Sequence, residues 1–337
     1  WLEPLDIRVA LLTGRQTGKV RAALETDLAS GAIQVAVGTH ALFQEDIAFQ
    51  RLVLAIVDEQ HRFGVHQRLQ LREKGRHEGR FPHQLVMTAT PIPRTLAMTA
   101  YADLDVSIID ELPPGRTPIR TVVLPDTRRS DIVERIDTAC RSGRQAYWVC
   151  PLIDESDLVR YEAAEKTAAQ LAEALPGVRI GLIHGRMAGK QKDVVMSSFK
   201  HGKLDLLVAT TVIEVGVDVP NASLMVIENA ERMGLAQLHQ LRGRVGRGSV
   251  ESTCVLLYQA PLSPIARERL AVLRETNDGF EVARRDLELR GPGELLGTRQ
   301  TGLMQLRVAD LIRDADLLPD VQRASALMLG GPQANIA

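Results

Sequence analysis

Short apolar runs alternate along this chain with longer stretches that carry apolar residues at helical spacing. Several short runs are continuously apolar and rich in Val, Ile and Leu, a pattern typical of strands buried on both faces of a parallel sheet. The predicted strands are residues 33–37, 52–57, 84–87, 119–124, 146–150, 178–183, 204–209, 224–227 and 253–258. The predicted helices are residues 19–30, 94–101, 128–141, 158–175, 190–200 and 236–241. This alternation predicts an α/β fold of doubly wound units.

Two changes in the pattern divide the chain. Proline and glycine cluster at residues 112–118, which favours a linker between two sheets. Near the C-terminus, two predicted helices at residues 265–276 and 280–289 form a hairpin, and a glycine-rich loop follows at residues 291–302. We therefore expect a first parallel-sheet domain at residues 1–115 without its opening strands, a second at residues 116–262, and a helical hairpin with a loop at residues 263–337.

Adjacent acids, Asp58 and Glu59, directly follow the predicted strand at residues 52–57. In open α/β folds, ligands bind at the carboxyl edge of the sheet. At such an edge Asp58 can hold Mg²⁺, which prefers oxygen ligands, and Glu59 can orient or deprotonate a water that attacks a γ-phosphate. The alternative is a helix amino terminus that carries acids because of the helix dipole.

Two threonines, Thr88 and Thr90, follow the next predicted strand and precede a helix that starts with proline. They could be simple capping hydroxyls. Their position one strand after the acidic pair instead favours a switch coupled to a nucleotide.

Two arginines in the second half, Arg244 and Arg247, are three positions apart and flanked by glycines. Glycine lets backbone or phosphate approach closely, and guanidinium groups bind phosphate oxygens in a bidentate manner. A solvated basic turn is the alternative. In combination with the acidic pair and the threonines, these arginines favour binding of a triphosphate.

The segments together resemble motifs II, III and VI of superfamily 2 helicases. The residues that carry the resemblance are Asp58-Glu59-Gln60-His61, Thr88-Ala89-Thr90 and Gln240-x-x-Gly243-Arg244-x-Gly246-Arg247. The longer strings DEQHRFGV (58–65) and TATPIPRTL (88–96) resemble the RecG family of branch-migration helicases and the related transcription-repair coupling factors. The strings ADLDVSIIDELPPGR (102–116) and DLELRGPGELLGTRQTG (286–302) favour RecG, because the coupling factors differ there. The resemblance covers essentially the whole chain.

The resemblance implies two RecA-like domains that bind ATP between them, with Mg²⁺ as the second cofactor. It implies that Asp58 coordinates Mg²⁺ and that Glu59 activates the hydrolytic water. Arg244 and Arg247 are implied as arginine fingers. The other residues implied in nucleotide binding and coupling are Gln60, His61, Thr88, Thr90, Gly216, Asp218 and Gln240.

The resemblance also implies contacts with DNA. The residues concerned are Gly38, Thr39 and His40 in the first domain, and His184, Thr210 and Thr211 in the second. The hairpin and loop resemble the segment that couples ATP-driven closure to translocation in RecG, where we expect Arg290, Arg299 and Gln300 to act. A glycine-rich surface connection is the alternative for that loop. Residues 232–247 contain four arginines and no acids, so DNA binding should depend on salt.

One family motif, the phosphate-binding loop G-x-x-x-x-G-K-[ST], is missing. Gly14, Gly18 and Lys19 look similar, but only three residues separate the glycines, and Val20 replaces the hydroxyl that binds Mg²⁺. We interpret this stretch as unrelated to the loop. The chain begins at Trp1 and lacks the family's wedge domain, so we expect a C-terminal fragment of a longer protein that hydrolyses ATP poorly by itself.

Composition limits the possible functions. The 337 residues are 45% hydrophobic and 25% charged with a net charge of −1, which argues against a globally basic nucleic-acid coat but allows a local basic groove. Cys140, Cys150 and Cys254 form no C-x-x-C pair, so we expect neither a disulfide scaffold nor a cysteine zinc site. The sequence contains no long apolar run and no signal peptide, which favours a cytoplasmic protein.

The sequence therefore predicts an ATP-dependent DNA helicase and translocase that remodels stalled forks and Holliday junctions in DNA repair and recombination. Branched DNA is the expected partner, with single-stranded-DNA-binding protein as a further one, and the resemblance implies a monomer. Two alternatives stay open: the translocase module of a transcription-repair coupling factor, and a catalytically inactive DNA-binding module.

Overall fold

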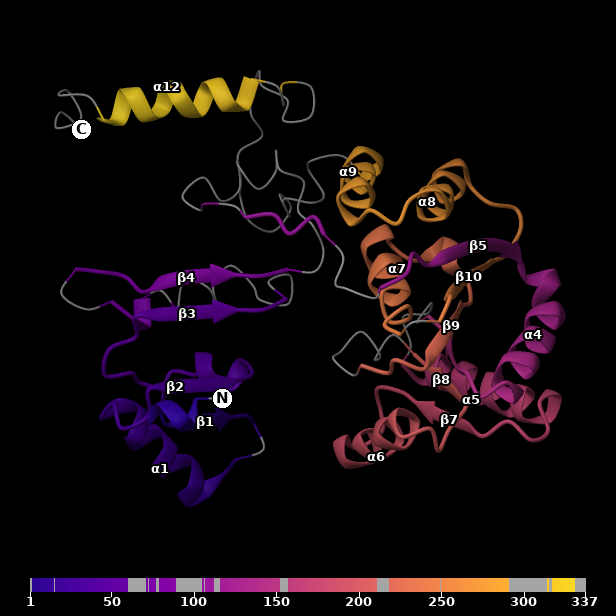
Figure 1. Ribbon diagram of the computed structural model, residues 1–337, viewed down its shortest axis with the longest axis horizontal. Coiled ribbons are helices and arrows are strands. Elements are labelled where there is room, and N and C mark those ends of the chain that lie inside the picture. Colours follow the sequence, from indigo (N-terminus) through magenta and orange to yellow (C-terminus); the bar gives the residue numbers. More distant parts are fainter. Residues whose placement is uncertain are drawn as a thin grey trace. The chain divides into compact units, whose positions relative to one another are not determined.

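The chain divides into two compact units, Trp1–Ala89 and Thr90–Ala337, each with hydrophobic clusters of its own. Figure 1 shows the elements of both units in a computed structural model. The structure describes residues 2–14, 16–59, 71, 73–76, 79–88, 105, 107–111, 116–151, 157–210, 218–248, 250–290, 314 and 317–330. No helix in these ranges is long and apolar enough to cross a membrane.

The first unit contains two pairs of parallel strands. β1 (Val9–Leu12) pairs with β2 (Val35–Gly38), and α1 (Gly18–Ala29) connects them. β3 (Leu54–Val57) pairs with β4 (His83–Val86). Two short 3-10 turns, η1 (Glu3–Leu5) and η2 (His40–Phe43), flank the first pair. Burial alternates along β1 and β3, so these strands bury one face only.

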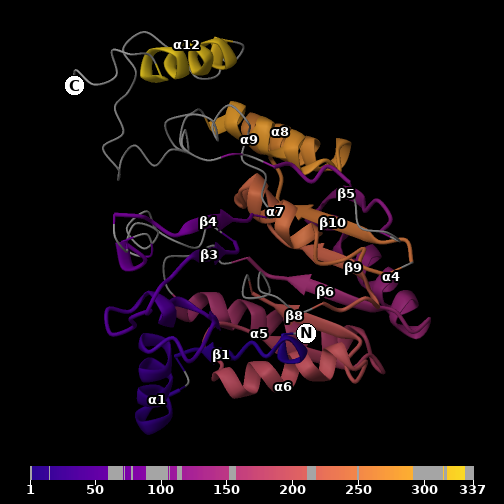
Figure 2. The same ribbon diagram turned by 60° about the vertical axis from the view of Figure 1, so that its left-hand side comes forward.

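The second unit is built around a six-stranded parallel sheet with the order β5-β10-β9-β6-β8-β7, most of which is labelled in Figure 2. Its strands are β5 (Arg120–Pro125), β6 (Gln145–Val149), β7 (Ile180–Ile183), β8 (Leu206–Ala209), β9 (Ala222–Ile227) and β10 (Thr253–Tyr258). Its helices are α4 (Arg129–Arg141), α5 (Asp157–Ala174), α6 (Gly189–Lys200), α7 (Leu235–Arg242), α8 (Pro264–Glu275), α9 (Gly279–Arg290) and α12 (Leu318–Gly330). Two 3-10 turns are η4 (Asp126–Arg128) and η6 (Ala230–Arg232).

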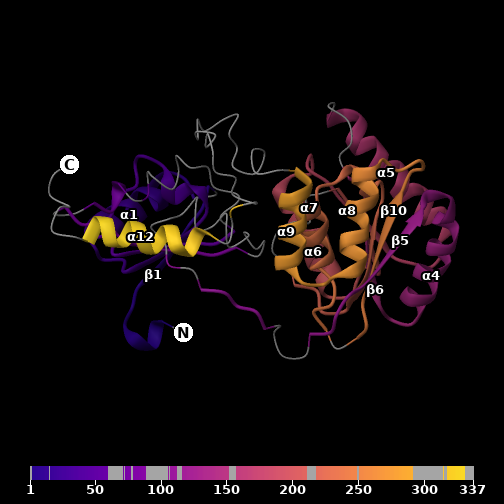
Figure 3. The same ribbon diagram turned by 90° about the horizontal axis from the view of Figure 1, so that it is seen from above.

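Helices cover both faces of this sheet, as Figure 3 shows from above. α4 and α5 pack on one face, and α6, α7 and α8 pack on the other. The central strand β6 is buried along its whole length because its side chains enter both layers. Trp148 lies in the layer of α4 and α5, whereas Tyr147 lies in the other layer with its ring centre 4.9 Å from that of Phe199.

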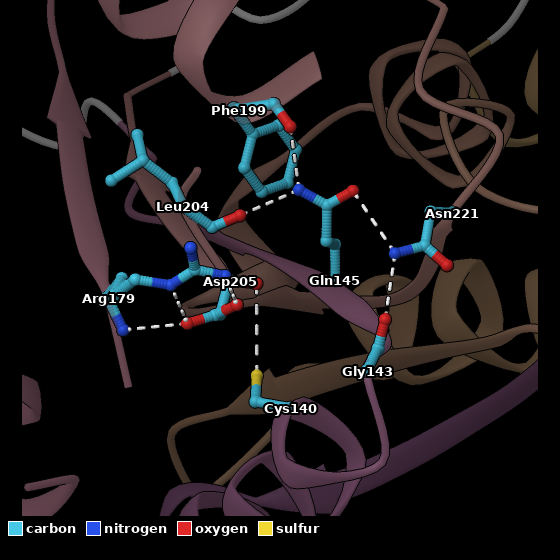
Figure 4. A network of polar contacts seen from close by, with 8 residues as sticks. All are labelled: Cys140, Gly143, Gln145, Arg179, Phe199, Leu204, Asp205 and Asn221. Carbon is cyan, nitrogen blue, oxygen red and sulfur yellow. Dashed lines mark hydrogen bonds and ion pairs between the residues drawn. The ribbon is translucent and has the colours of Figure 1, made fainter. Parts of the chain in front are cut away.

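A network of polar contacts holds the amino ends of the central strands together (Figure 4). The buried Gln145 donates from Nε2 to the carbonyls of Phe199 and Leu204, both at 2.7 Å. Arg179 and Asp205 form an ion pair at 2.6 Å beside it. A buried amide satisfied in this way stabilises the sheet, since an unpaired one would cost about 1–3 kcal/mol.

The predicted fold class is confirmed, with parallel sheets, helices on both faces and the hairpin of α8 and α9. All nine predicted strands are present with shifts of at most a few residues at their ends, and β10 has the predicted bounds. The prediction missed β1 and α12. The predicted helix at residues 94–101 and the loop at 291–302 lie outside the described residues, and the boundaries at 115 and 262 stay predictions.

Candidate functional site

The acidic pair and the first threonine come together at one edge of the first unit. β3 and β4 are parallel with Val57 opposite Val86, so Asp58, Glu59 and Thr88 leave the same carboxyl edge. The N–H of Met87 donates to the carbonyl of Val57 at 2.8 Å, which extends the pairing to these residues. The arrangement is the one expected from sequence.

A sharp turn sets the direction of the two acids. Glu59 has φ of 52°, and its N–H donates to Asp58 Oδ1 at 2.9 Å. A side chain other than glycine adopts this left-handed conformation rarely, and such residues cluster at functional sites. Asp58 and Thr88 are exposed. The side-chain oxygens of these two residues are therefore accessible, and oxygen is the ligand atom that Mg²⁺ prefers.

The segment Gly38–His40 follows β2 at the edge of the other strand pair. A Cβ on Gly38 would lie 2.3 Å from the carbonyl oxygen of Leu12 and 2.9 Å from Leu42 Cγ, so only glycine fits. The N–H of Thr39 donates to the same Leu12 carbonyl at 3.3 Å. Thr39 and His40 are exposed and can be reached by a DNA strand.

The Gly14–Val20 stretch follows β1 and includes the first turn of α1, where Gly18 begins the helix with φ of 61°. A strand, a loop and a helix in this order are also the context of a phosphate-binding loop. The side chain of Val20, at the position of the missing hydroxyl, is 63% exposed and offers no oxygen. The interpretation of this stretch stays a prediction.

Two residues predicted to contact DNA lie side by side at the carboxyl edge of the second unit. β7 and β8 pair with Ile183 opposite Ala209, which brings His184 next to Thr210. His184 Nε2 lies 3.6 Å from Glu165 Oε1. Thr210 is fully buried, so its hydroxyl does not reach solvent in this arrangement.

The two arginines of the predicted finger segment lie just beyond α7. Arg247 forms a partly exposed ion pair with Asp218, with 3.4 Å between Nη1 and Oδ1. Arg247 Nε and Arg116 Nη2 both donate to the carbonyl of Gly243, at 3.3 and 3.1 Å. The predicted residues Asp218 and Arg247 are therefore brought together, and Arg116 is an additional cation that the sequence analysis did not identify.

Gly246 gives this segment its shape. It has φ of 76°, and a Cβ at this position would lie 2.8 Å from Ile119 Cγ1. The left-handed conformation and the close contact both require glycine.

Burial raises the pKa of the nearby Tyr147 hydroxyl to about 12, although the positive charges of Arg244 and Arg247 act to lower it. Burial lowers the pKa of Arg116, and the charge of Arg247 lowers it further.

A buried guanidinium, that of Arg242, fastens α7 to the end of α8. Arg242 Nη1 donates to the carbonyls of Leu273 and Thr276 at 2.9 and 2.7 Å. Carbonyls at a helix C-terminus have no partner within the helix and favour a cation. Arg242 therefore links the finger segment to the helical hairpin, a contact that the sequence analysis also missed.

Replacing Arg242 by methionine should lower the free energy of unfolding of the second unit by about 3 kcal/mol, because one buried and one partly buried carbonyl lose their donor. Urea unfolding followed by circular dichroism measures this loss. Arg274→Met on the exposed surface of α8 is the matched control and should change stability by less than about 0.5 kcal/mol. Equal stability of the two variants would contradict the role given to Arg242.

The imidazole of His239 is held neutral beside this arginine. Arg242 Nη2 lies 3.0 Å from His239 Nδ1, and a guanidinium can only donate, so Nδ1 accepts. Burial, followed by the charges of Arg242 and Arg116, lowers the pKa of His239 from 6.5 to about 4. Between pH 6.5 and about 4, His239 therefore binds a proton in the unfolded chain but stays neutral in the folded protein.

Stability should fall as pH decreases through this range, because protonation favours the unfolded state. Between pH 7 and 5 the wild type should lose about 2 kcal/mol more than His239→Gln, which cannot titrate. Urea midpoints of the two proteins at both pH values give the difference. Parallel losses in the two proteins would show that His239 is not held neutral.

Several predicted site residues lie outside the described part of the chain, and the structure says nothing of their placement. They are Gln60, His61, Thr90, Thr211, Gly216, Arg299 and Gln300, together with the side chain of Arg290. Gln240 and Arg244 are described and half-buried.

Three family profiles match consecutive parts of the chain. They are the DEAD/DEAH box helicase profile at residues 1–99, the helicase conserved C-terminal domain at 129–249, and the profile of ATP-dependent DNA helicase RecG, domain 3, C-terminal, at 276–334. The last match covers α9, the second helix of the hairpin, and the segment that follows it.

Individual relatives match almost the full length of this chain. ATP-dependent DNA helicase RecG of Escherichia coli is 66% identical over 96% of this chain and 47% of its own length, and that of Haemophilus influenzae is 62% identical with the same coverage. A solved structure of RecG bound to a three-way DNA junction is 44% identical, with a TM-score of 0.69 over 94% of this chain and 41% of its own. The chain thus spans about half the length of the curated relatives that it matches.

Proposed function

Since the chain belongs to the RecG family of DNA helicases over the part that it spans, we propose that it is the helicase portion of an ATP-dependent DNA translocase. In this proposal the protein remodels stalled replication forks and Holliday junctions by branch migration, in DNA repair and recombination. In this proposal, each of the two sheet-based units contains one of the RecA-like domains predicted from sequence.

One observation carries the proposal most directly. Phosphoryl transfer needs carboxylates that hold the metal and orient the water, and it needs cations that stabilise the phosphate charge. The acids that follow β3 can supply the first, and the arginines that follow α7 can supply the second. Asp58 would hold Mg²⁺, and Glu59 would orient the attacking water. Arg244 and Arg247 would neutralise charge that develops on the phosphates.

The charge of Mg²⁺ would offset that of the phosphates and so supply electrostatic stabilisation. The donors that would hold it are oxygens of Asp58, and Thr88 lies two residues beyond the neighbouring strand β4. Gln60 and His61 are proposed to couple the γ-phosphate to the other domain with Thr90 as a relay, and Gly216 and Gln240 are proposed to belong to the nucleotide interface. Asp218 would release Arg247 when the phosphates arrive, at a small cost because the ion pair is partly exposed.

Contacts with DNA complete the proposal. Gly38, Thr39 and His40 are exposed at the end of β2, which supports a contact with a strand there. His184, Thr210 and Thr211 are proposed to contact DNA from the second unit, and Arg290, Arg299 and Gln300 to act in translocation. The burial of Thr210 means that such a contact would use its backbone or a rearranged side chain.

The setting of the protein is part of the same proposal. The relatives are bacterial DNA helicases, so we place the protein in the cytoplasm with the chromosome. Single-stranded-DNA-binding protein as a partner and monomeric action stay predictions. The RecG match over α9 and the residues after it favours this family over a transcription-repair coupling factor.

Unwinding of synthetic forks and Holliday junctions tests the proposal. The protein to use is a version extended upstream through a phosphate-binding loop, called the extended protein below. It should convert forks and junctions to unwound products only with ATP and Mg²⁺, and linear duplex far more slowly. Equal activity on linear and branched DNA would rule out branch migration as the function.

A further inference from the structure

A groove in the second unit is lined by none of the residues assigned above to ATP and DNA. It runs between α4 and the strands β5, β10 and β9, and has a volume of about 620 Å³. α4 packs toward β6 through Ile136 and Cys140, which leaves the sheet beyond it only partly covered. In Figure 1, α4 lies next to β5, the strand at the end of the sheet.

The floor of the groove is apolar. It consists of strand side chains that point to the α4 face, and its wall includes two isoleucines of α4. The residues are Val122, Leu124, Leu224, Val226 and Val255 on the floor and Ile132 and Ile136 on the wall. Val122, Leu124 and Leu224 stay partly exposed. An apolar side chain placed here would gain about 25 cal/mol for each Å² of apolar surface buried.

The rim of the groove is cationic. Four exposed arginines line it, Arg120, Arg128, Arg135 and Arg144, against two acids, Asp131 and Glu134. Arg128 is engaged with Asp131 at 2.6 Å. Among the residues that the structure describes, the other three arginines form no ion pair. The rim therefore has positive charge available for an anionic ligand.

We propose that this groove docks an acidic peptide segment of a partner protein that carries apolar side chains between its carboxylates. Aspartates or glutamates would pair with Arg120, Arg135 and Arg144, since guanidinium groups bind carboxylates in a bidentate manner. The apolar side chains would cover the exposed floor. A nucleic-acid backbone satisfies only the rim, because its phosphates gain nothing from a floor of valine and leucine.

Fluorescence anisotropy tests the docking with the 337-residue chain itself. The probe is a fluorescein-labelled peptide in which single leucines are separated by pairs of aspartates. Arg135→Glu and Arg144→Glu should each weaken its binding about tenfold, since each replaces an attraction by a repulsion. Arg141→Glu is the matched control, because Arg141 is exposed on the same helix but does not line the groove. It should stay within about twofold of wild type.

Two further probes separate the floor from the rim. A peptide with serine in place of leucine should bind about tenfold more weakly, since it leaves the floor uncovered. A single-stranded oligonucleotide should not displace the acidic peptide. The proposal is overturned if the acidic peptide does not bind, if the two rim variants bind it like wild type, or if the oligonucleotide competes with the same dependence on Arg135 and Arg144. The arginines are exposed, so melting by circular dichroism should show that both variants fold as the wild type does.

Discussion

Replacing Arg247 by alanine in the extended protein should lower the turnover number for ATP on the order of 10³- to 10⁵-fold, the range known for loss of an arginine finger. The physical reason is that charge develops on the phosphate oxygens in the transition state and needs a fixed cation. Gly246 has no Cβ, which lets the backbone of the segment pass close to Ile119 with φ of 76°. Steady-state ATPase assays with saturating forked DNA measure the change.

The matched control is Arg141→Ala, a solvent-exposed arginine on α4 that pairs with Asp137. It should leave turnover unchanged. Fork binding by Arg247→Ala, measured by gel shift, should be close to that of wild type, because the arginine is assigned to ATP and not to DNA. Near-normal turnover in Arg247→Ala would remove it from the catalytic residues.

Glu59→Gln should lower ATP turnover on the order of 10²- to 10⁴-fold in the extended protein, the usual contribution of a general base. Glutamine has nearly the same shape but cannot accept the proton of the attacking water. The turn at φ of 52° does not depend on the carboxylate, since the hydrogen bond across it uses the Glu59 N–H and Asp58 Oδ1. Folding and ATP binding should therefore be retained.

Binding of a fluorescent ATP analogue distinguishes loss of catalysis from loss of binding. The affinity of Glu59→Gln for it should stay within about threefold of wild type, since only the hydrolytic step is affected. Glu73→Gln, an exposed acid of the same unit, serves as the control and should hydrolyse ATP normally. Turnover by Glu59→Gln within tenfold of that of Glu73→Gln would assign the water to another base.

Local signals in the sequence located most of the fold. β10 was predicted with its observed bounds because polar residues border a continuous apolar run on both sides. β1 was missed although it has the same length and alternating burial as β3, which was predicted. α12 was also missed, and several of its apolar residues are exposed.

The candidate site was predictable where chemistry and chain order coincide. Asp58, Glu59 and Thr88 follow neighbouring strands, so a parallel sheet brings them to one edge. Arg116 was not predictable, because it contacts Gly243 across 127 positions of sequence. Arg242 was counted only as local positive charge, and its contact with the end of α8 depends on how two helices pack. Long-range packing of this kind leaves no signal in a single sequence.

The most direct test of the central claim is ATP hydrolysis stimulated by forked DNA, measured in parallel for the 337-residue chain and for the extended protein. We expect the extended protein to hydrolyse ATP and to be stimulated by forks, whereas the chain alone stays near background because its sequence lacks the G-x-x-x-x-G-K-[ST] loop. Equal turnover by the chain alone would contradict this account and would point to Gly14, Gly18 and Lys19 as a working phosphate loop. Absence of turnover in both proteins would leave a DNA-binding module in place of a helicase.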